Sequence, residues 1–276
     1  QDVWPLDPQF LSQMKYFIPW LPVDKDPAPP PVLDKIRFAY KILTFSRFGQ
    51  KTLEKAGFTS NLILEGTDLN IFKPLDRQEC RKFFGLPPDA FIFGMIGANK
   101  ENPPRKGYQE AMEAFKMFSD KHPEALLFLH NQQVTPGGFP IPGFAKYLGI
   151  EGKVIMLDNY KATFVADSEM VNKELNAFDV TLHPSQTEGF GLVIIESQAA
   201  GVPVIIQRAQ SQVELVKDGE TGWIAETASK RWTNDNSWVN VASPQSVYEC
   251  MEKAYTAVKS NREKIALDCR GWIKGN

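Results

Sequence analysis

Residues 180–206 contain the feature that most restricts the fold of this chain: two short apolar runs separated by a glycine turn and a helical segment. The runs at 180–182 and 202–206 lack the polar alternation of a half-exposed strand. Apolar strands of this kind are buried on both faces, which is typical of a parallel sheet covered by helices. Gly191 precedes the helical segment and Gly201 ends it. The stretch therefore predicts a strand–helix–strand unit of an α/β fold.

The turn of this unit has the sequence Glu188-Gly189-Phe190-Gly191. It opens a helix N-terminus, where free backbone N–H groups and the positive end of the helix dipole favour a phosphate or pyrophosphate. Its glycines let the backbone approach a ligand closely. Glu196 lies eight positions after Glu188, about two helical turns further on. The two carboxylates can therefore contact different parts of an elongated ligand, although a surface helix with two solvated acids is the simpler alternative.

The rest of the chain repeats the same alternation of strands and helices. Residues 32–66 predict helices at 32–40 and 47–56 and short strands at 42–46 and 61–64. Strands are predicted at 91–97, 125–130, 154–157, 179–183 and 202–206, and helices at 76–84, 107–120, 167–176, 191–200 and 243–260, with a short helix after a Gly/Pro-rich loop at 135–143. This order predicts a doubly wound, Rossmann-like sheet.

Ligands of such sheets bind beyond the carboxyl ends of the strands. Four residues fall at those ends, Gly97, His130, Asp158 and Ser185. We expect the ligand site at the edge that these positions share.

A basic pair, Arg105 and Lys106, lies in the loop after the predicted strand 91–97 and just before a helix. An arginine fork and a lysine ammonium at such a loop can neutralise a diphosphate. A solvated basic pair is the ordinary alternative. The glutamate turn on the same sheet edge favours the functional interpretation.

The run from Glu188 to Leu192, then Glu196, then Ala-Gly-Val-Pro-Val-Ile at 200–205, resembles the E-x7-E signature of retaining glycosyltransferases of family 4. The resemblance covers most of residues 36–260 and includes Arg105-Lys106-Gly107. It implies the GT-B fold, which has two Rossmann-like domains. Residues 67–276 would form the nucleotide-sugar-binding domain, and residues 1–66 an incomplete second, acceptor-side domain. The early strands and glycine-rich loop of that second domain have no counterpart here.

The resemblance also implies roles for single residues. Glu196 would bind the ribose hydroxyls of a nucleotide-diphospho-sugar, and Glu188 the hydroxyls of its sugar. Arg105 and Lys106 would stabilise the departing diphosphate. The implied catalytic residues are thus Glu188, Arg105 and Lys106, and the implied donor-binding residues are Asn99, Gly189, Phe190, Gly191, Leu192 and Glu196.

The sequence departs from the family pattern at two places. Many members carry an arginine directly after the glycine that matches Gly97, where this chain has Ala98, and Arg105 is expected to supply that charge. Many also carry a histidine in the acceptor-side domain, but no histidine precedes His122.

Residues 1–31 are rich in proline and aromatic residues, and we expect an irregular or extended loop. Asp24-Lys25-Asp26 has the form of a D-x-D metal motif. We discount that motif because it serves metal-dependent transferases of a different fold. The resemblance instead places this loop on the acceptor side, where Asp24 is a weak candidate for substrate contact.

Composition excludes several other classes of protein. The net charge of −2 and pI near 6.0 give no basic face for nucleic acid. No apolar run approaches the roughly 18–20 residues of a membrane span, and the first residues do not resemble a signal peptide. The three cysteines are scattered and read as reduced thiols of a cytosolic protein. We expect no metal site and no cofactor, and a location in the cytoplasm or peripherally at a membrane.

The leading hypothesis is therefore a retaining glycosyltransferase that transfers a sugar from a nucleotide-diphospho-sugar to an acceptor. The acceptor, whether sugar, glycan, lipid or protein, is not determined, and neither is the base of the donor. The alternative is a non-catalytic nucleotide-sugar-binding subunit, with a partner chain that completes the N-terminal domain. A GT-B epimerase or phosphorylase is a weaker third hypothesis.

Overall fold

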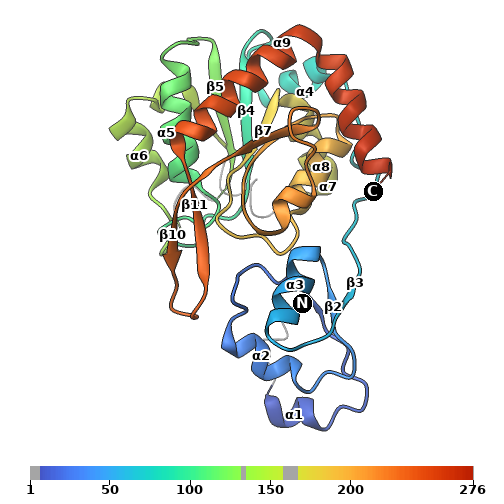
Figure 1. Ribbon diagram of the computed structural model, residues 1–276. Helices are drawn as coiled ribbons and strands as arrows, with labels where there is room; N and C mark the ends of the chain where they lie inside the picture. Colours follow the sequence, from blue (N-terminus) through green and yellow to red (C-terminus); the bar gives the residue numbers. More distant parts are fainter. Residues whose placement is uncertain (1–6, 132–134, 158–166, 276) are drawn as a thin grey trace.

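The computed structural model describes residues 7–131, 135–157 and 167–275. Its centre is a six-stranded, wholly parallel sheet with the strand order β6-β5-β4-β7-β8-β9 (Figure 1). The strands are β4 (Phe91–Ile96), β5 (Ala125–His130), β6 (Val154–Met156), β7 (Val180–His183), β8 (Val204–Gln207) and β9 (Gly222–Ala225). The order reverses between β4 and β7, so the carboxyl ends of these two strands form the switch point at which such sheets bind ligands.

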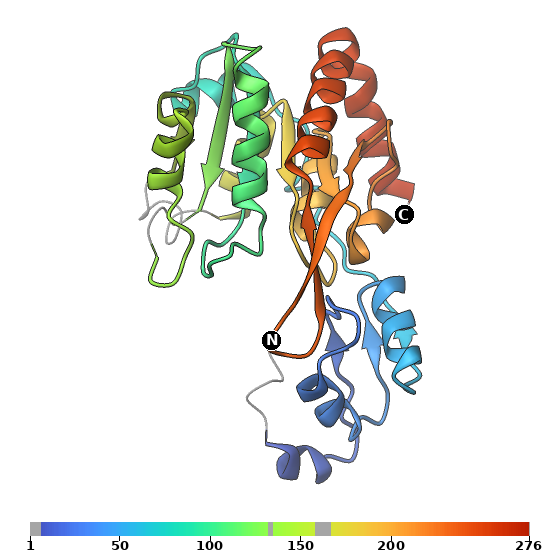
Figure 2. The same cartoon turned by 60° about the vertical axis from the view of Figure 1, so that its left-hand side comes forward.

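Helices cover both faces of this sheet, as expected for a doubly wound fold (Figures 1 and 2). They are α4 (Arg77–Phe84), α5 (Tyr108–Ser119), α6 (Ile141–Leu148), α7 (Ser168–Ala177), α8 (Leu192–Ala199) and α9 (Pro244–Gly275), with the 3-10 helices η1 (Glu151–Lys153) and η3 (Gln210–Glu214). Their ends follow the sequence: the Asp76 carboxylate accepts hydrogen bonds from the N–H groups of Gln78 and Glu79 at the start of α4, and Gly85 ends that helix.

A smaller unit lies near the N-terminus. It contains a three-stranded parallel sheet of β1 (Trp20–Leu21), β2 (Leu43–Thr44) and β3 (Asn61–Leu62), with the helices α1 (Pro8–Ser12), α2 (Pro30–Ile36) and α3 (Arg47–Lys55). The sheet strands here are two residues long, and Leu21, Val23, Ile36, Ile42 and Leu53 form its buried core. This unit lies below the carboxyl ends of the large sheet in Figure 1.

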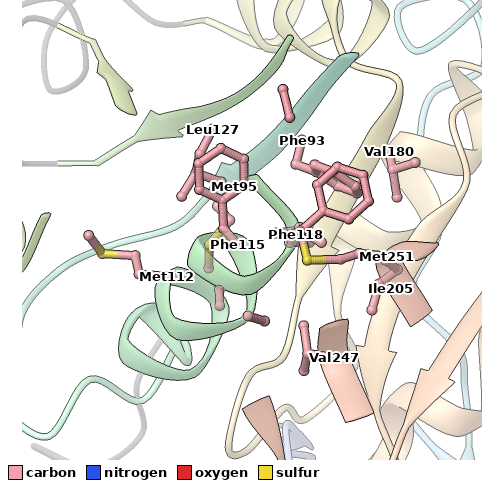
Figure 3. Packing of buried hydrophobic residues seen from close by; sticks show 14 of the residues in the cluster. Phe93, Met95, Met112, Phe115, Phe118, Leu127, Val180, Ile205, Val247 and Met251 are labelled. Atoms are coloured by element: carbon pink, nitrogen blue, oxygen red, sulfur yellow. The ribbon is translucent and has the colours of Figure 1, made fainter. Parts of the chain in front are cut away.

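The main core lies between the sheet and the helices α5 and α9. Phe93, Phe115 and Phe118 are fully buried there, and the Phe93 ring contacts each of the other two edge to face (Figure 3). Met251 from α9 packs against the same cluster. This packing fixes β4 and the start of α5, the two elements that flank the loop with the basic pair.

The structure confirms the predicted strands and helices from residue 32 onward and corrects the prediction in three places. Residues 7–31 are not wholly irregular, because they contain α1 and β1; the first six residues lie outside the described part of the chain. The sequence analysis also missed β9 and the antiparallel hairpin of β10 (Thr227–Trp232) and β11 (Trp238–Ala242). The last helix continues to Gly275 through a kink at Asn261 rather than ending near residue 260.

Candidate functional site

The sequence-predicted residues gather at the switch point between β4 and β7. Two loops meet there, one after each strand, and two helices, α5 and α8, begin where the loops end. The backbone N–H of Gln186 donates to the carbonyl of Arg105 at 2.7 Å, and Ser185 Oγ donates to the same carbonyl at 3.2 Å. These bonds hold the basic loop against the glutamate loop.

Gly107 makes this close approach of the two loops feasible. It lies at the start of α5 with a φ of +72°, and a Cβ atom there would lie 2.2 Å from the carbonyl oxygen of Pro184. Any other residue would push the two loops apart. The glycine after the basic pair is therefore a structural requirement of the site.

The charged side chains of the two loops form one cluster around Glu188. Lys106 Nζ lies 2.5 Å from Glu188 Oε1, and His183 Nε2 lies 3.0 Å from the same oxygen. Arg105 Nη1 donates to the carbonyl of Thr187 at 2.7 Å and lies 3.7 Å from Glu188 Oε1. The predicted diphosphate-binding cations and the predicted sugar-binding carboxylate are thus in direct contact.

Burial and charge set the protonation of this cluster. Burial alone would raise the pKa of Glu188, but the His183 hydrogen bond and the cations Lys106 and Arg105 reverse this and hold the pKa well below its usual value. Burial lowers the pKa of His183 and that of Lys106, although Glu188 opposes both shifts. We conclude that Glu188 is ionised and that a neutral His183 donates its Nε2–H to it.

The glutamate turn runs directly into α8. Ser211 Oγ donates to the carbonyls of Glu188 at 2.7 Å and of Phe190 at 3.0 Å, which fixes the turn from η3. At Gly189, a Cβ atom would lie 2.4 Å from the Cβ of Pro22, so the N-terminal unit packs directly on the turn. The first N–H groups of α8 therefore point toward the junction between the two parts of the chain.

A cleft of about 260 Å³ opens at this junction. The loops of the large sheet contribute the charged cluster and the glutamate turn to this cleft. Pro22, Phe45 and Glu65 come from the N-terminal unit and the segment that follows it. The lining residues are Pro22, Phe45, Glu65, Lys106, His183, Glu188, Gly189, Phe190, Gly191, Leu192 and Val193. Most of the predicted site residues thus share one cleft, with Arg105 beside it through its contact with Glu188.

Glu196 lies in α8, outside the lining of this cleft. Its side chain is half-buried, and no hydrogen-bond or ion-pair partner contacts it among the described residues. Burial raises its pKa from 4.5 to about 7. The two glutamates of the motif therefore lie in opposite environments, one ionised by cations and one desolvated without a partner.

Asn99 is also outside the cleft. Its side chain is buried, its Oδ1 accepts from the N–H of Phe139 at 2.8 Å, and its Nδ2 donates to the Phe139 carbonyl at 2.9 Å. This pairing ties the loop after β4 to the segment before α6. A direct role of Asn99 in ligand binding stays a prediction, whereas its role in holding the loop is visible.

A second, larger cavity of about 410 Å³ adjoins the cleft, since both are lined by Glu65 and Phe190. It lies among the start of α3, the segment after β3, α8 and the end of α9, with Ile195 and Trp272 in its walls. Burial raises the pKa of Glu65. Together the two hollows form an elongated space along the start of α8.

Three contacts of this region were not predicted. His183, at the end of β7, is a buried partner of Glu188. Asp24 Oδ2 accepts from Thr187 Oγ1 at 3.1 Å, beside the cluster. Glu214 accepts from the N–H groups of Arg47 and Phe48 at 2.9 and 2.7 Å and so caps α3 across the junction. Glu214 is far from α3 in the sequence, so no local sequence signal indicated that its carboxylate caps this helix.

Two other predicted positions lie away from the cleft or outside the description. His130 is buried at the end of β5 with its Nδ1 2.6 Å from Glu174 Oε2. Asp158 lies outside the described residues.

Within the described ranges, no group of three or more His, Cys, Asp or Glu side chains is arranged to hold a metal ion. The three cysteines are free and buried.

The arrangement of this structure defines a protein of GT-B type. The Anabaena protein Alr3699/HepE, solved in complex with UDP and glucose, matches with a TM-score of 0.68 and 20% identity, over 89% of this chain and 61% of that chain. The C-terminal domain of a group 1 glycosyl transferase (LpcC) from Francisella tularensis matches with a TM-score of 0.60 and 23% identity, over 76% of this chain and 98% of that chain. These likenesses confirm the predicted α/β fold of GT-B type.

Residues 76–234 match the family model of glycosyl transferases group 1, and the chain belongs to this family. A D-inositol 3-phosphate glycosyltransferase from Streptomyces scabiei (strain 87.22) is 32% identical over 167 residues, which are 58% of this chain and 36% of the relative. The chain thus spans about a third of the length of such curated relatives. No helix in the described ranges is both long and apolar enough to cross a membrane.

Proposed function

We propose that this chain is the donor-binding part of a retaining glycosyltransferase of family 4, which transfers a sugar from a nucleotide-diphospho-sugar to an acceptor. The observation that carries the proposal is the convergence of Arg105, Lys106, Glu188 and the N-terminus of α8 on one cleft at the switch point of the sheet. Two cations, one carboxylate and a helix N-terminus are the groups that a diphosphate linked to a sugar requires.

Arg105 and Lys106 stabilise the negative charge of the departing diphosphate in this proposal. Lys106 is largely buried, so its charge acts in a region of low dielectric and needs no reorganisation during the reaction. The N–H groups at the start of α8 act on the same phosphates. Because these groups supply the positive charge, the proposed reaction uses no metal and no cofactor.

The two glutamates bind opposite ends of the donor. Glu188, held ionised by its neighbours, accepts hydrogen bonds from hydroxyls of the transferred sugar. Glu196, further along α8, accepts from the ribose hydroxyls. The C–O bond between sugar and diphosphate then breaks through an oxocarbenium-like transition state, and the acceptor hydroxyl oxygen forms the new bond on the same face of the sugar while its proton passes to the departing diphosphate.

The Anabaena protein described above was solved with UDP and glucose, which makes a UDP-hexose the first donor to test. The family match does not bear on the acceptor, because it covers residues 76–234, which hold the charged cluster, and not the N-terminal unit. We place the acceptor on the side of Pro22 and Phe45, which close the cleft opposite the glutamate turn. The domains are proposed as 1–66 and 67–276, and the location as cytoplasmic or peripheral at a membrane.

A second candidate function is a nucleotide-sugar-binding subunit whose acceptor-side domain is completed by a partner chain. The small unit favours it, because its three strands are two residues long and large apolar side chains stay exposed around them. These are Phe10, Met14, Tyr16, Ile18, Trp20 and Tyr40. Two of them, Tyr16 and Tyr40, contact each other, and exposed apolar side chains that gather on one unit are typical of a binding face.

Calorimetric titration with UDP-, GDP- and ADP-glucose, each with its free nucleoside diphosphate, tests the proposal. We expect one base to bind, and we expect Lys106→Ala to weaken the diphosphate and the sugar nucleotide but not the nucleoside. The surface variant Lys116→Ala is a matched control, since Lys116 lies on α5 outside the cleft and forms an ion pair with Asp120. Binding of none of the three diphosphates would contradict the proposal. Sugar transfer by the chain alone favours the enzyme, and binding without transfer favours the subunit.

A further inference from the structure

A second charged centre lies at the opposite edge of the large sheet, where β4 and β7 begin. Its middle is Asp179, which is 1% exposed and immediately precedes β7. Asp179 Oδ2 accepts from Arg81 Nη2 at 2.8 Å and from the N–H of Ile92 at 2.6 Å. Asp179 Oδ1 accepts from Arg77 Nη1 at 2.5 Å and from Arg262 Nη2. Three guanidinium groups therefore converge on one carboxylate.

Arg81 has a structural role in this centre. It is buried on α4, and its remaining N–H groups donate to the carbonyls of Ala177 at 3.1 Å, Pro88 at 2.6 Å and Ala90 at 2.9 Å. It alone suffices to neutralise Asp179. The other two arginines are not needed for that purpose.

Arg77 and Arg262 differ from Arg81 in their surroundings. Their side chains are 31% and 36% exposed, and each has one hydrogen-bonding partner, Asp179, within the described residues. Both line a hollow of about 310 Å³, together with Lys259 from α9 and Asp89 from the turn before β4. The unused N–H groups of both guanidinium forks are thus available beside an open space.

The charges of this centre do not balance. Four cations, Arg77, Arg81, Lys259 and Arg262, face the carboxylates Asp89 and Asp179, and Lys259 also attracts the Glu124 carboxylate, which leaves one positive charge in excess. Burial and the repulsion of Arg77 and Arg81 lower the pKa of Arg262 to about 9, so it is still charged at neutral pH. A region with surplus positive charge is stabilised by a bound anion.

We propose that this hollow is a second anion site, which binds the dianion of a phosphate monoester. Arginine forks match the oxygen pairs of a phosphate group, and a phosphoryl group carries close to two negative charges at neutral pH. The volume of about 310 Å³ exceeds that of a bare phosphate, so the hollow has room for a small group attached to it. The site is separate from the cleft, since it lies at the other ends of β4 and β7 (Figure 1).

The position of Arg262 gives this site a structural context. Arg262 directly follows the kink of α9 at Asn261, where φ is −157° and ψ is 72°. Beyond the kink, Trp272 Nε1 donates to the carbonyl of Leu215 at 3.0 Å, close to the wall of the larger cavity. The anion would therefore bind at the bend of the helix whose end reaches the donor side.

The test uses the full chain with Arg105→Ala and Lys106→Ala introduced to remove phosphate binding at the cleft. Inorganic phosphate, glucose 6-phosphate and malonate are titrated by calorimetry at constant ionic strength. We expect both phosphates to bind and malonate to bind at least tenfold more weakly. Tighter binding of glucose 6-phosphate than of phosphate identifies a phosphorylated metabolite, and equal binding identifies free phosphate.

Arg77→Gln in this background should weaken phosphate binding roughly tenfold to a hundredfold, the usual effect of losing one charge-assisted contact. Lys259→Ala, which leaves the Asp179 bonds intact, should weaken it severalfold even if Arg77→Gln impairs folding. Lys253→Ala, on the same helix but outside the hollow, is the matched control. Phosphate binding that is absent, matched by malonate, or unchanged in Lys259→Ala and Arg77→Gln would overturn the proposal.

Discussion

Glu196 offers the sharpest test of the site, because its side chain is half-buried with no hydrogen-bond or ion-pair partner among the described residues, and burial raises its pKa from 4.5 to about 7. The substitution Glu196→Gln keeps the shape of the side chain and removes its titration. In the wild type, the folded chain holds the proton more tightly than the unfolded chain. The stability of the wild type should therefore fall as the pH rises from about 4.5 through about 7, and the variant should lack this fall.

The size of the effect follows from the two pKa values. A pKa difference of one corresponds to about 1.4 kcal/mol, so ionising Glu196 costs the folded state about 3 kcal/mol at pH 8. At pH 5.5 the same group costs about 1 kcal/mol, because it is still mostly protonated in the folded chain. Glu196→Gln should thus gain about 2 kcal/mol relative to the wild type between these two pH values.

Urea unfolding of both proteins at pH 5.5 and pH 8 measures this difference, and every group other than Glu196 cancels in the comparison. A stability difference between variant and wild type that is the same at both pH values would refute the reasoning, since it would mean that Glu196 is not desolvated.

Nucleoside diphosphate should bind the wild type with release of a proton near pH 6.5, because ribose hydroxyls donate to the ionised carboxylate. The variant should release fewer protons in buffers of different ionisation enthalpy, because only the terminal phosphate of the ligand, with a pKa of about 6, then contributes.

Three further outcomes are expected. Arg105→Ala and Lys106→Ala should each weaken nucleoside diphosphate binding about tenfold to a hundredfold and leave nucleoside binding unchanged, as calorimetry can show; equal losses for both ligands would count against a diphosphate contact. Glu188→Gln should leave the free nucleoside diphosphate nearly unaffected but reduce sugar-nucleotide binding or turnover, and the opposite pattern would exchange the roles of Glu188 and Glu196. Donor binding measured in EDTA and in manganese should be the same, and a loss in EDTA that manganese restores would refute metal independence.

The sequence was sufficient to predict five of the six strands of the large sheet because these five carry strong local signals. The runs at 91–97 and 202–206 are continuous and apolar, and glycines separate strand from helix at Gly191 and Gly201. Local signals also located the basic pair and the glutamate turn at one sheet edge, since parallel strands share the edge of their carboxyl ends. The position of these groups follows from topology alone.

The missing elements had weak or misleading signals. In β10 most side chains are exposed, so the strand shows little apolar patterning, and its pairing with β11 depends on the turn near Asn236. The α9 helix continues past residue 260 because Cys269 is buried and Arg270 donates to carbonyls of distant segments, including that of Phe72 at 3.0 Å. Contacts between distant segments override the local propensity at such places.

The candidate site also combines features that the sequence predicted with features that only the folded chain shows. Residue types and spacing identified Glu188 and Lys106, but only the folded chain shows that they touch each other and that His183 supports the contact. Asn99 is a different case: the family resemblance implied that it binds the donor, which stays a prediction, and the structure shows in addition that it holds the Phe139 segment. A single sequence gives no means to tell which polar groups at a sheet edge will pair with the backbone.

The contact between Lys106 and Glu188 explains how the site keeps a lysine ammonium in a buried place. Lys106 next to Arg105 alone would tend to lose its proton on burial, since desolvation and the neighbouring cation both lower its pKa. Glu188 opposes this shift, and the neutral His183 orients Glu188 without adding a charge. Lys106 and Arg105 are therefore both placed beside the N-terminus of α8, each with a carboxylate near it: Glu188 lies 2.5 Å from Lys106, and Glu101 lies 3.4 Å from Arg105.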